Sequence, residues 1–157
     1  MKKRLGLLAA AALAALSLTA IGLAAAGADT YKLDGTMTKG QEVPKPKGAK
    51  AGATGTFHAT FVEGTNGGTL RWKLTYKNLT GPAVAAHIHV GAKGKAGNVL
   101  VALCAAPGKP CKSGMTGRVH VSETVFDTLE KKATYANVHT AKNPGGEIRA
   151  NLKVSES

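Results

Sequence analysis

Residues 69–78 read TLRWKLTYKN, and apolar and polar side chains alternate through nearly all of this stretch. Successive side chains of an extended strand point to opposite faces of a sheet. The stretch therefore has two unlike faces: the apolar one is formed by Leu70, Trp72, Leu74 and Tyr76, and the polar one by Arg71, Lys73, Thr75 and Lys77. This alternation predicts a β-strand with one face in a hydrophobic core and the other in water.

The same period of two recurs along most of the chain after residue 28. It is present in residues 54–64, 117–123, 133–140 and 146–154, while residues 98–104 are more continuously apolar. Clusters of Gly, Pro and Asn separate these segments, as expected for turns. Many short strands between turns predict an all-β fold, namely a Greek-key-like antiparallel β-sandwich or barrel.

Two segments do not follow this period. Residues 122–132 place Ser122 where a helix N-cap is expected and space Val125, Phe126 and Leu129 as a helix does, which predicts one short helix. Residues 41–53 contain two prolines and three lysines without periodicity, which predicts a loop or an edge segment.

The first 28 residues have the pattern of a secretory signal peptide: a basic start, a Leu/Ala-rich core and two Ala-x-Ala frames ending at Ala26 and Ala28. We expect residues 1–28 to be removed and residues 29–157 to form one periplasmic or secreted domain, with no membrane span after cleavage. The alternative is an uncleaved anchor, because residues 5–28 are apolar and long enough to cross a bilayer.

The sequence contains two cysteines, Cys104 and Cys111, on either side of a Pro/Gly-containing turn. In an exported chain such a pair is typical of a single disulfide. Two free thiols are the alternative.

The chain is strongly basic, and residues 29–157 contain 18 basic and 9 acidic side chains, a net charge of +9. Most of this charge is expected to be solvated, but it also favours an anionic envelope lipid, an acidic polysaccharide or a protein as partner. We expect no nucleic-acid binding, because the seven aromatic residues lie mostly on inward faces and offer no stacking platform. Nucleophile triads, paired catalytic acids and phosphate-binding glycine motifs are also absent from the sequence.

Residues 85–91 read AAHIHVG and place two histidines on one face of a predicted strand. His87 and His89 would point away from the core, since Ala86 and Ile88 lie on the opposite face. Their Cα atoms would be about 7 Å apart, close enough for both imidazoles to bind one ion. The alternative is two solvated side chains without a metal.

Three segments together resemble the CHRD domain, a module first named from chordin and common in exported bacterial proteins. They are QEVP (41–44), AAHIHVGAKGKAGNVLVALC (85–104) and YANVHTAKNPGGEIRANL (135–152). The resemblance spans residues 30–153 and implies a single exported all-β domain without an established enzymatic activity. It assigns family motif positions to Glu42, His87, His89, Asn137, His139, Glu147 and Arg149, among others.

A second resemblance, to copper-zinc superoxide dismutases, concerns the HIH, NVH and GGEIR motifs and their order. It implies a copper site with an arginine nearby, although the long zinc-binding loop of that family has no counterpart in this sequence. We therefore expect His87, His89 and His139 to bind copper, or zinc as the alternative, with His120 as a fourth candidate ligand.

Three further residues are expected near this site. Arg149 and Glu147 are predicted on one face of the last strand, as a salt bridge or turn clamp, or with the arginine orienting an anion. Asn137 is expected to form local hydrogen bonds. The sequence thus favours a copper-binding module, with a dismutase-like copper enzyme or a metal-free structural or adhesion domain as alternatives.

Overall fold

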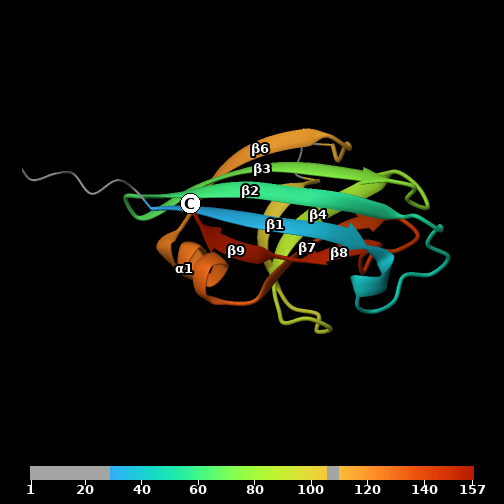
Figure 1. Cartoon of the computed structure of the whole chain (residues 1–157). Helices are drawn as coiled ribbons and strands as arrows, with labels where there is room; N and C mark the ends of the chain where they lie inside the picture. Colours follow the sequence, from blue (N-terminus) through green and yellow to red (C-terminus); the bar gives the residue numbers. More distant parts are fainter. Residues whose placement is uncertain (1–28, 106–109) are drawn as a thin grey trace, which may run out of the picture.

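A computed structural model describes residues 29–105 and 110–157 of the chain (Figure 1). The predicted signal peptide, residues 1–28, lies outside the described residues. The strands are β1 (Thr30–Thr38), β2 (Thr54–Gly64), β3 (Gly67–Lys77), β4 (Ala83–Val90), β5 (Val99–Cys104), β6 (Met115–Val121), β7 (Thr134–Thr140), β8 (Ile148–Asn151) and β9 (Lys153–Glu156), with a 3-10 turn η1 (Lys39–Gln41) and a helix α1 (Glu123–Lys131). None of the helices in the described part is long and apolar enough to span a membrane.

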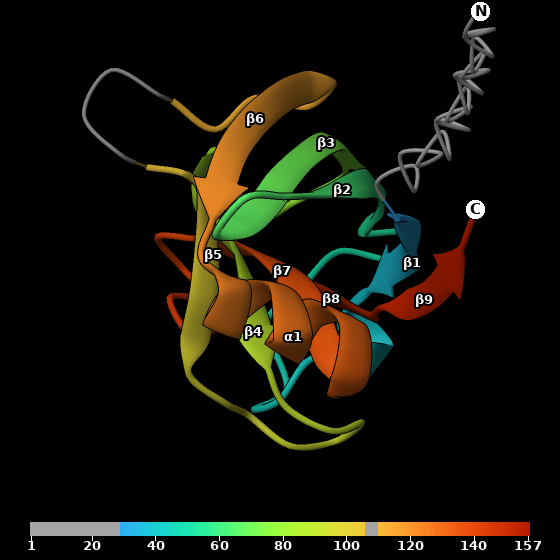
Figure 2. The same ribbon diagram turned by 90° about the vertical axis from the view of Figure 1, so that its left-hand side faces the viewer.

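The strands form one antiparallel sheet that curves into a nearly closed barrel (Figures 1 and 2). Their order is β5-β4-β7-β8-β1-β2-β3-β6. The remaining strand, β9, follows β8 along the chain and pairs with β1. The predicted all-β antiparallel fold with one short helix is confirmed. Non-consecutive neighbours such as β4 and β7 show that connections cross the ends of the barrel.

The hydrophobic core fills the barrel with the residues that the alternation places inward. On β3, Leu70 and Leu74 have no exposed surface and Trp72 is buried, whereas Arg71 and Lys73 are exposed. The alternation also predicts that Tyr76 points inward, and this residue is half-buried at the end of the strand. The period of two in this segment therefore predicts its two faces correctly.

Helix α1 lies at one end of the barrel (Figure 2). Phe126 packs on Phe61 with ring centroids 4.2 Å apart, and Leu129 is also buried. The predicted helix is confirmed, but Ser122 occupies the N-cap position without forming a side-chain capping hydrogen bond. The helix is held by its apolar face rather than by its cap.

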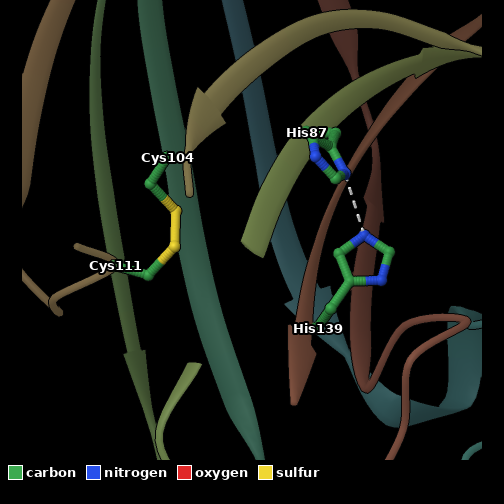
Figure 3. Close-up of a disulfide and its surroundings, with 4 residues drawn as sticks. All are labelled: His87, Cys104, Cys111 and His139. Carbon is green, nitrogen blue, oxygen red and sulfur yellow. Dashed lines mark hydrogen bonds between the residues drawn. A yellow bond between two sulfur atoms is a disulfide. The ribbon is translucent and has the colours of Figure 1, made fainter. Parts of the chain in front are cut away.

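The two ends of the sheet path, β5 and β6, are joined by the disulfide between Cys104 and Cys111 (Figure 3). Cys104 ends β5 and Cys111 precedes β6, and the two Cα atoms are 5.3 Å apart. The predicted disulfide thus connects the two strands between which the sheet has no hydrogen-bonded ladder.

The outer face of β7 and β8 is covered, and that of β4 is partly covered. All seven residues of β7 are buried, including the polar side chains that point away from the core. Two segments lie over this face: residues 39–47, which contain η1 and the first part of the predicted loop 41–53, and residues 91–98, which follow β4. A second, polar interior therefore lies between this part of the sheet and the loops.

Candidate metal centre

Three histidines meet on this covered face. His87 and His89 lie on β4, and His139 lies on the neighbouring β7, where the register pairs His87 with Asn137 and Ala85 with His139. One ring nitrogen from each histidine lies within 4.8 Å of those of the other two. Figure 3 shows the His87 and His139 rings pointing toward one another from the two strands. The structure thus brings three of the four predicted ligands together.

The histidines are less exposed than the sequence suggested. His89 and His139 are each 8% exposed, and His87 is half-buried. The prediction that they point away from the hydrophobic core is correct, but the prediction that they lie at the exterior of the domain is wrong for His89 and His139. Alternation defines which face a side chain occupies and carries no information about a loop that later covers that face.

Backbone carbonyls fix the tautomers of two of the rings. His89 Nδ1 donates to the carbonyl of Gly97 and His139 Nδ1 donates to that of Pro144, both at 2.9 Å. A carbonyl only accepts hydrogen bonds, so the proton is on Nδ1 and Nε2 keeps its lone pair in both rings. His139 Nε2 accepts from His87 Nδ1 at 3.1 Å, whereas His89 Nε2 is buried without a partner among the described residues.

All three imidazoles are held in the neutral form. Burial lowers the pKa of His87 to about 4, and the neighbouring His139 and His89 add to that shift. Burial also lowers the pKa of His89 and of His139, although the carbonyls of Gly97 and Pro144 act in the opposite direction. Neutral imidazole is the form that binds metals, so the cluster does not need to lose charge before it takes up a cation.

A stack of planar groups positions His89. The His89 ring lies parallel to the Tyr135 ring, and their centroids are 4.8 Å apart. The guanidinium carbon of Arg149 also lies over the Tyr135 ring, 3.4 Å from its centroid. Gly97 donates its N–H to the Tyr135 hydroxyl at 3.1 Å. A Cβ on Gly97 would lie 1.7 Å from the carbonyl oxygen of Val90, so this close approach of the loop requires glycine.

Arg149 is used as a structural group. Its side chain is fully buried, and its guanidinium donates to the carbonyls of Lys95 and Ala92 at 2.8 and 2.9 Å and to Asn151 Oδ1. It therefore ties the loop 91–98 to β8. These contacts leave no exposed guanidinium to steer an anion to the histidines, which argues against that predicted role.

Glu147 and Arg149 do not form the predicted salt bridge. Glu147 instead accepts hydrogen bonds from Thr80, Thr140 and Asn143 at 2.6 to 3.2 Å, so it acts as the predicted turn clamp. Burial alone would raise the pKa of Glu147, but these hydrogen bonds hold it below its usual value. Glu147 and Arg149 therefore have separate hydrogen-bond partners, and the carboxyl group that acts electrostatically on Arg149 is that of Glu42.

A third buried charged residue, Glu42, lies beside Asn137. A Cβ on Gly146, which has a φ of +121°, would lie 2.5 Å from the Glu42 carboxyl carbon and 2.9 Å from the Asn137 amide nitrogen. Burial raises the pKa of Glu42 to about 7, with the Val43 N–H acting against that shift. Asn137 lies beside both the Glu42 carboxyl and the His89 ring and acts to lower the pKa of Glu42, while Glu42 Oε2 and Asn137 Oδ1 have no partner of good hydrogen-bond geometry among the described residues.

The remaining histidines lie elsewhere. His120 is exposed on β6, opposite Thr69, and the structure does not bring it to the cluster. His58 is exposed on β2 and its Nδ1 lies 2.6 Å from Asp34. Sequence reasoning missed Tyr135, although its position two residues before Asn137 and four before His139 on an alternating strand would have placed it on the same face.

Residues 33–152 match the CHRD domain. The chain belongs to the CHRD family. The matched region of this CHRD domain runs from β1 to the end of β8 and contains the three histidines, Glu42 and Arg149. Neither a comparison with curated proteins nor one with solved structures returns a match.

Proposed function

We propose that this CHRD domain is an exported metal-binding module in which His87, His89 and His139 hold one copper ion. The observation that carries the proposal is the cluster itself, in which one ring nitrogen of each histidine lies within 4.8 Å of those of the other two, and the buried Nε2 of His89 has no partner of good hydrogen-bond geometry among the described residues. An unpaired buried nitrogen is costly in an apo protein, and a bound cation would remove that cost.

The surroundings of the rings support a metal. Histidine ligands of metal ions usually donate their second N–H to a carbonyl or carboxylate, which fixes the ring and raises its basicity. His89 and His139 both do so, to Gly97 and Pro144. In the metal-bound form the hydrogen bond between His87 and His139 would be replaced by coordination to the ion.

The ligand type favours copper. Imidazole nitrogen suits copper and zinc, whereas magnesium and calcium require oxygen ligands. Copper binds such sites more tightly than zinc in the general order of affinities. Zinc is the alternative that the titration below separates.

The cluster favours ion binding and exchange over a closed structural site. No fourth His, Cys, Asp or Glu joins the three histidines among the described residues, so a coordination position is left for water or a partner's group. His87 is half-buried, which gives that position a route to solvent. Since Arg149 is committed to Lys95, Ala92 and Tyr135, binding is favoured over dismutase-like catalysis.

Export of the domain is part of the proposal. A disulfide is typical of proteins that fold in oxidising compartments, and it supports the expectation of a periplasmic or secreted protein raised by the N-terminal sequence.

The test is titration of the purified protein with Cu(II) and Zn(II), followed by calorimetry, with a double variant His87→Ala/His89→Ala. We expect one copper ion per chain and a loss of affinity of more than about 100-fold in the variant, because two ligands are removed. The matched control is His58→Ala/His120→Ala, which removes two exposed histidines and should bind copper as the parent does. Equal copper affinity in both double variants would refute the proposal.

A further inference from the structure

The outer face of β1, β2, β3 and β6 presents rows of polar side chains to solvent. The register aligns Lys32 of β1, Thr60 of β2, Arg71 of β3 and Arg118 of β6 in one row across four neighbouring strands. Adjacent strands are about 4.8 Å apart, so the row extends across the sheet at right angles to its strands. Figure 1 shows these strands side by side.

Four cations of this face have no acidic partner. Lys32, Arg71, Lys73 and Arg118 are exposed, and none of them takes part in an ion pair within the described residues. The acidic group beside them, Asp34, is itself paired with His58 at 2.6 Å. The face therefore carries an excess of positive charge.

The arrangement of two of these cations is unfavourable without a ligand. Arg71 and Arg118 are directly opposite one another on β3 and β6. Like charges at directly opposed positions of an antiparallel pair destabilise a sheet. An anion bound between the two guanidinium groups would turn this repulsion into two attractive contacts.

The surface is also hollowed at this point. An open hollow of about 540 Å³ is lined by the side chains of these rows, among them Lys32, Arg71, Lys73 and Arg118. Thr60 and Thr116 add hydroxyl groups between the charges. The hollow thus offers cations for carboxylates and hydroxyls for sugar oxygens on one open surface, and its acidic group, Asp34, is hydrogen-bonded to His58.

We propose that this face binds an extended acidic polysaccharide, with its carboxylate groups on Arg71, Arg118, Lys73 and Lys32. Arginine can hold a carboxylate through two parallel hydrogen bonds, which gives the two guanidinium groups the leading part. The inference does not depend on the metal proposal, because none of the residues that line this face belongs to the histidine cluster.

Other polyanions fit this face less well. The aromatic residue nearest to it, Trp72, is buried on the inner side of β3, so there is no exposed ring on which nucleic-acid bases could stack. The exposed large apolar side chains of the described residues, Val84 and Val99, lie on β4 and β5 instead. A membrane surface would therefore meet charge here without apolar groups to insert.

The test measures binding of the purified protein to polygalacturonate, with neutral dextran, phosphatidylglycerol vesicles and single-stranded DNA as separate probes. The variant is Arg71→Gln/Arg118→Gln, and the control is Lys93→Gln/Lys95→Gln, which removes the same charge from the exposed loop 91–98. We expect affinity for polygalacturonate to fall about tenfold in the variant and less than twofold in the control. Affinity should also fall as salt is raised.

Thermal unfolding of both variants separates binding from folding, and the Arg71→Gln/Arg118→Gln protein should melt no lower than the parent because a repulsive pair is removed. Equal weakening in the two variants would overturn the proposal, since it would show attraction by net charge alone. Stronger binding to the vesicles or to DNA than to polygalacturonate would also overturn it.

Discussion

Two parts of the outer surface of the barrel have the same alternation of side chains but differ in exposure to solvent: one is covered by loops and the other is open. On β8 and on β3, every second side chain points away from the core, and both faces carry arginines. Arg149 on β8 has no exposed surface, whereas Arg71 on β3 is exposed. The difference is the pair of segments, residues 39–47 and 91–98, that covers the first face and leaves the second one open. A polar face becomes a polar interior when loops close over it, and its groups must then be hydrogen-bonded.

The largest expected contrast is between these two arginines. Arg149→Ala should lower the free energy of unfolding by about 4 kcal/mol, because it leaves the carbonyls of Lys95 and Ala92 without their donor and removes the stack on Tyr135. Arg71→Ala should change it by less than about 0.5 kcal/mol. Urea unfolding of both variants gives the two values. If the two variants lost similar amounts of stability, coverage by the loops would not explain the difference between the two faces.

The contrast also shows what the sequence could predict. Alternation placed Trp72 inward and Arg71 outward, and it placed His87, His89 and Arg149 on the face away from the core. It could not predict burial of the second face, because the covering segments are held by contacts between residues far apart in the chain, such as Gln41 with Asn151. The tautomer of His89 depends on the carbonyl of Gly97 in loop 91–98, and that of His139 on the carbonyl of Pro144 between β7 and β8, so neither can be predicted from local alternation.

A second prediction concerns a carboxyl group beneath the loops. Because burial raises the pKa of Glu42 to about 7, this carboxyl binds its proton more readily in the folded chain than in the unfolded one. Its contribution to stability is therefore greatest below about pH 4.5 and falls as the pH rises to about 7. Relative to Glu42→Gln, the parent should lose up to about 3 kcal/mol across this range.

Chemical unfolding at several pH values from 4 to 8 measures this difference. The control is Glu63→Gln, which changes an exposed carboxyl at the end of β2 and should alter the free energy of unfolding by less than about 0.5 kcal/mol. If the free energies of unfolding of the Glu42→Gln protein and the parent changed equally with pH, the pKa of Glu42 would not be raised by folding.

The smallest expected effect is on the open face. Arg118→Glu replaces the repulsion with Arg71 by an attraction, and it should raise the free energy of unfolding by about 0.5 kcal/mol at low salt. The gain should vanish at about 1 M salt, because exposed charges are screened there. Thermal melting at two salt concentrations measures it, and a gain that persists at high salt would point to packing instead of charge.

The bond between Cys104 and Cys111 gives the whole barrel a dependence on its redox surroundings. It joins the two end strands of the sheet, β5 and β6, whereas neighbouring strands elsewhere in the sheet are paired by main-chain hydrogen bonds. Reduction of this bond would remove the covalent link between β5 and β6, which are not paired by main-chain hydrogen bonds. The entropy of the unfolded chain would rise, so an oxidising compartment would favour the folded barrel over a reducing one.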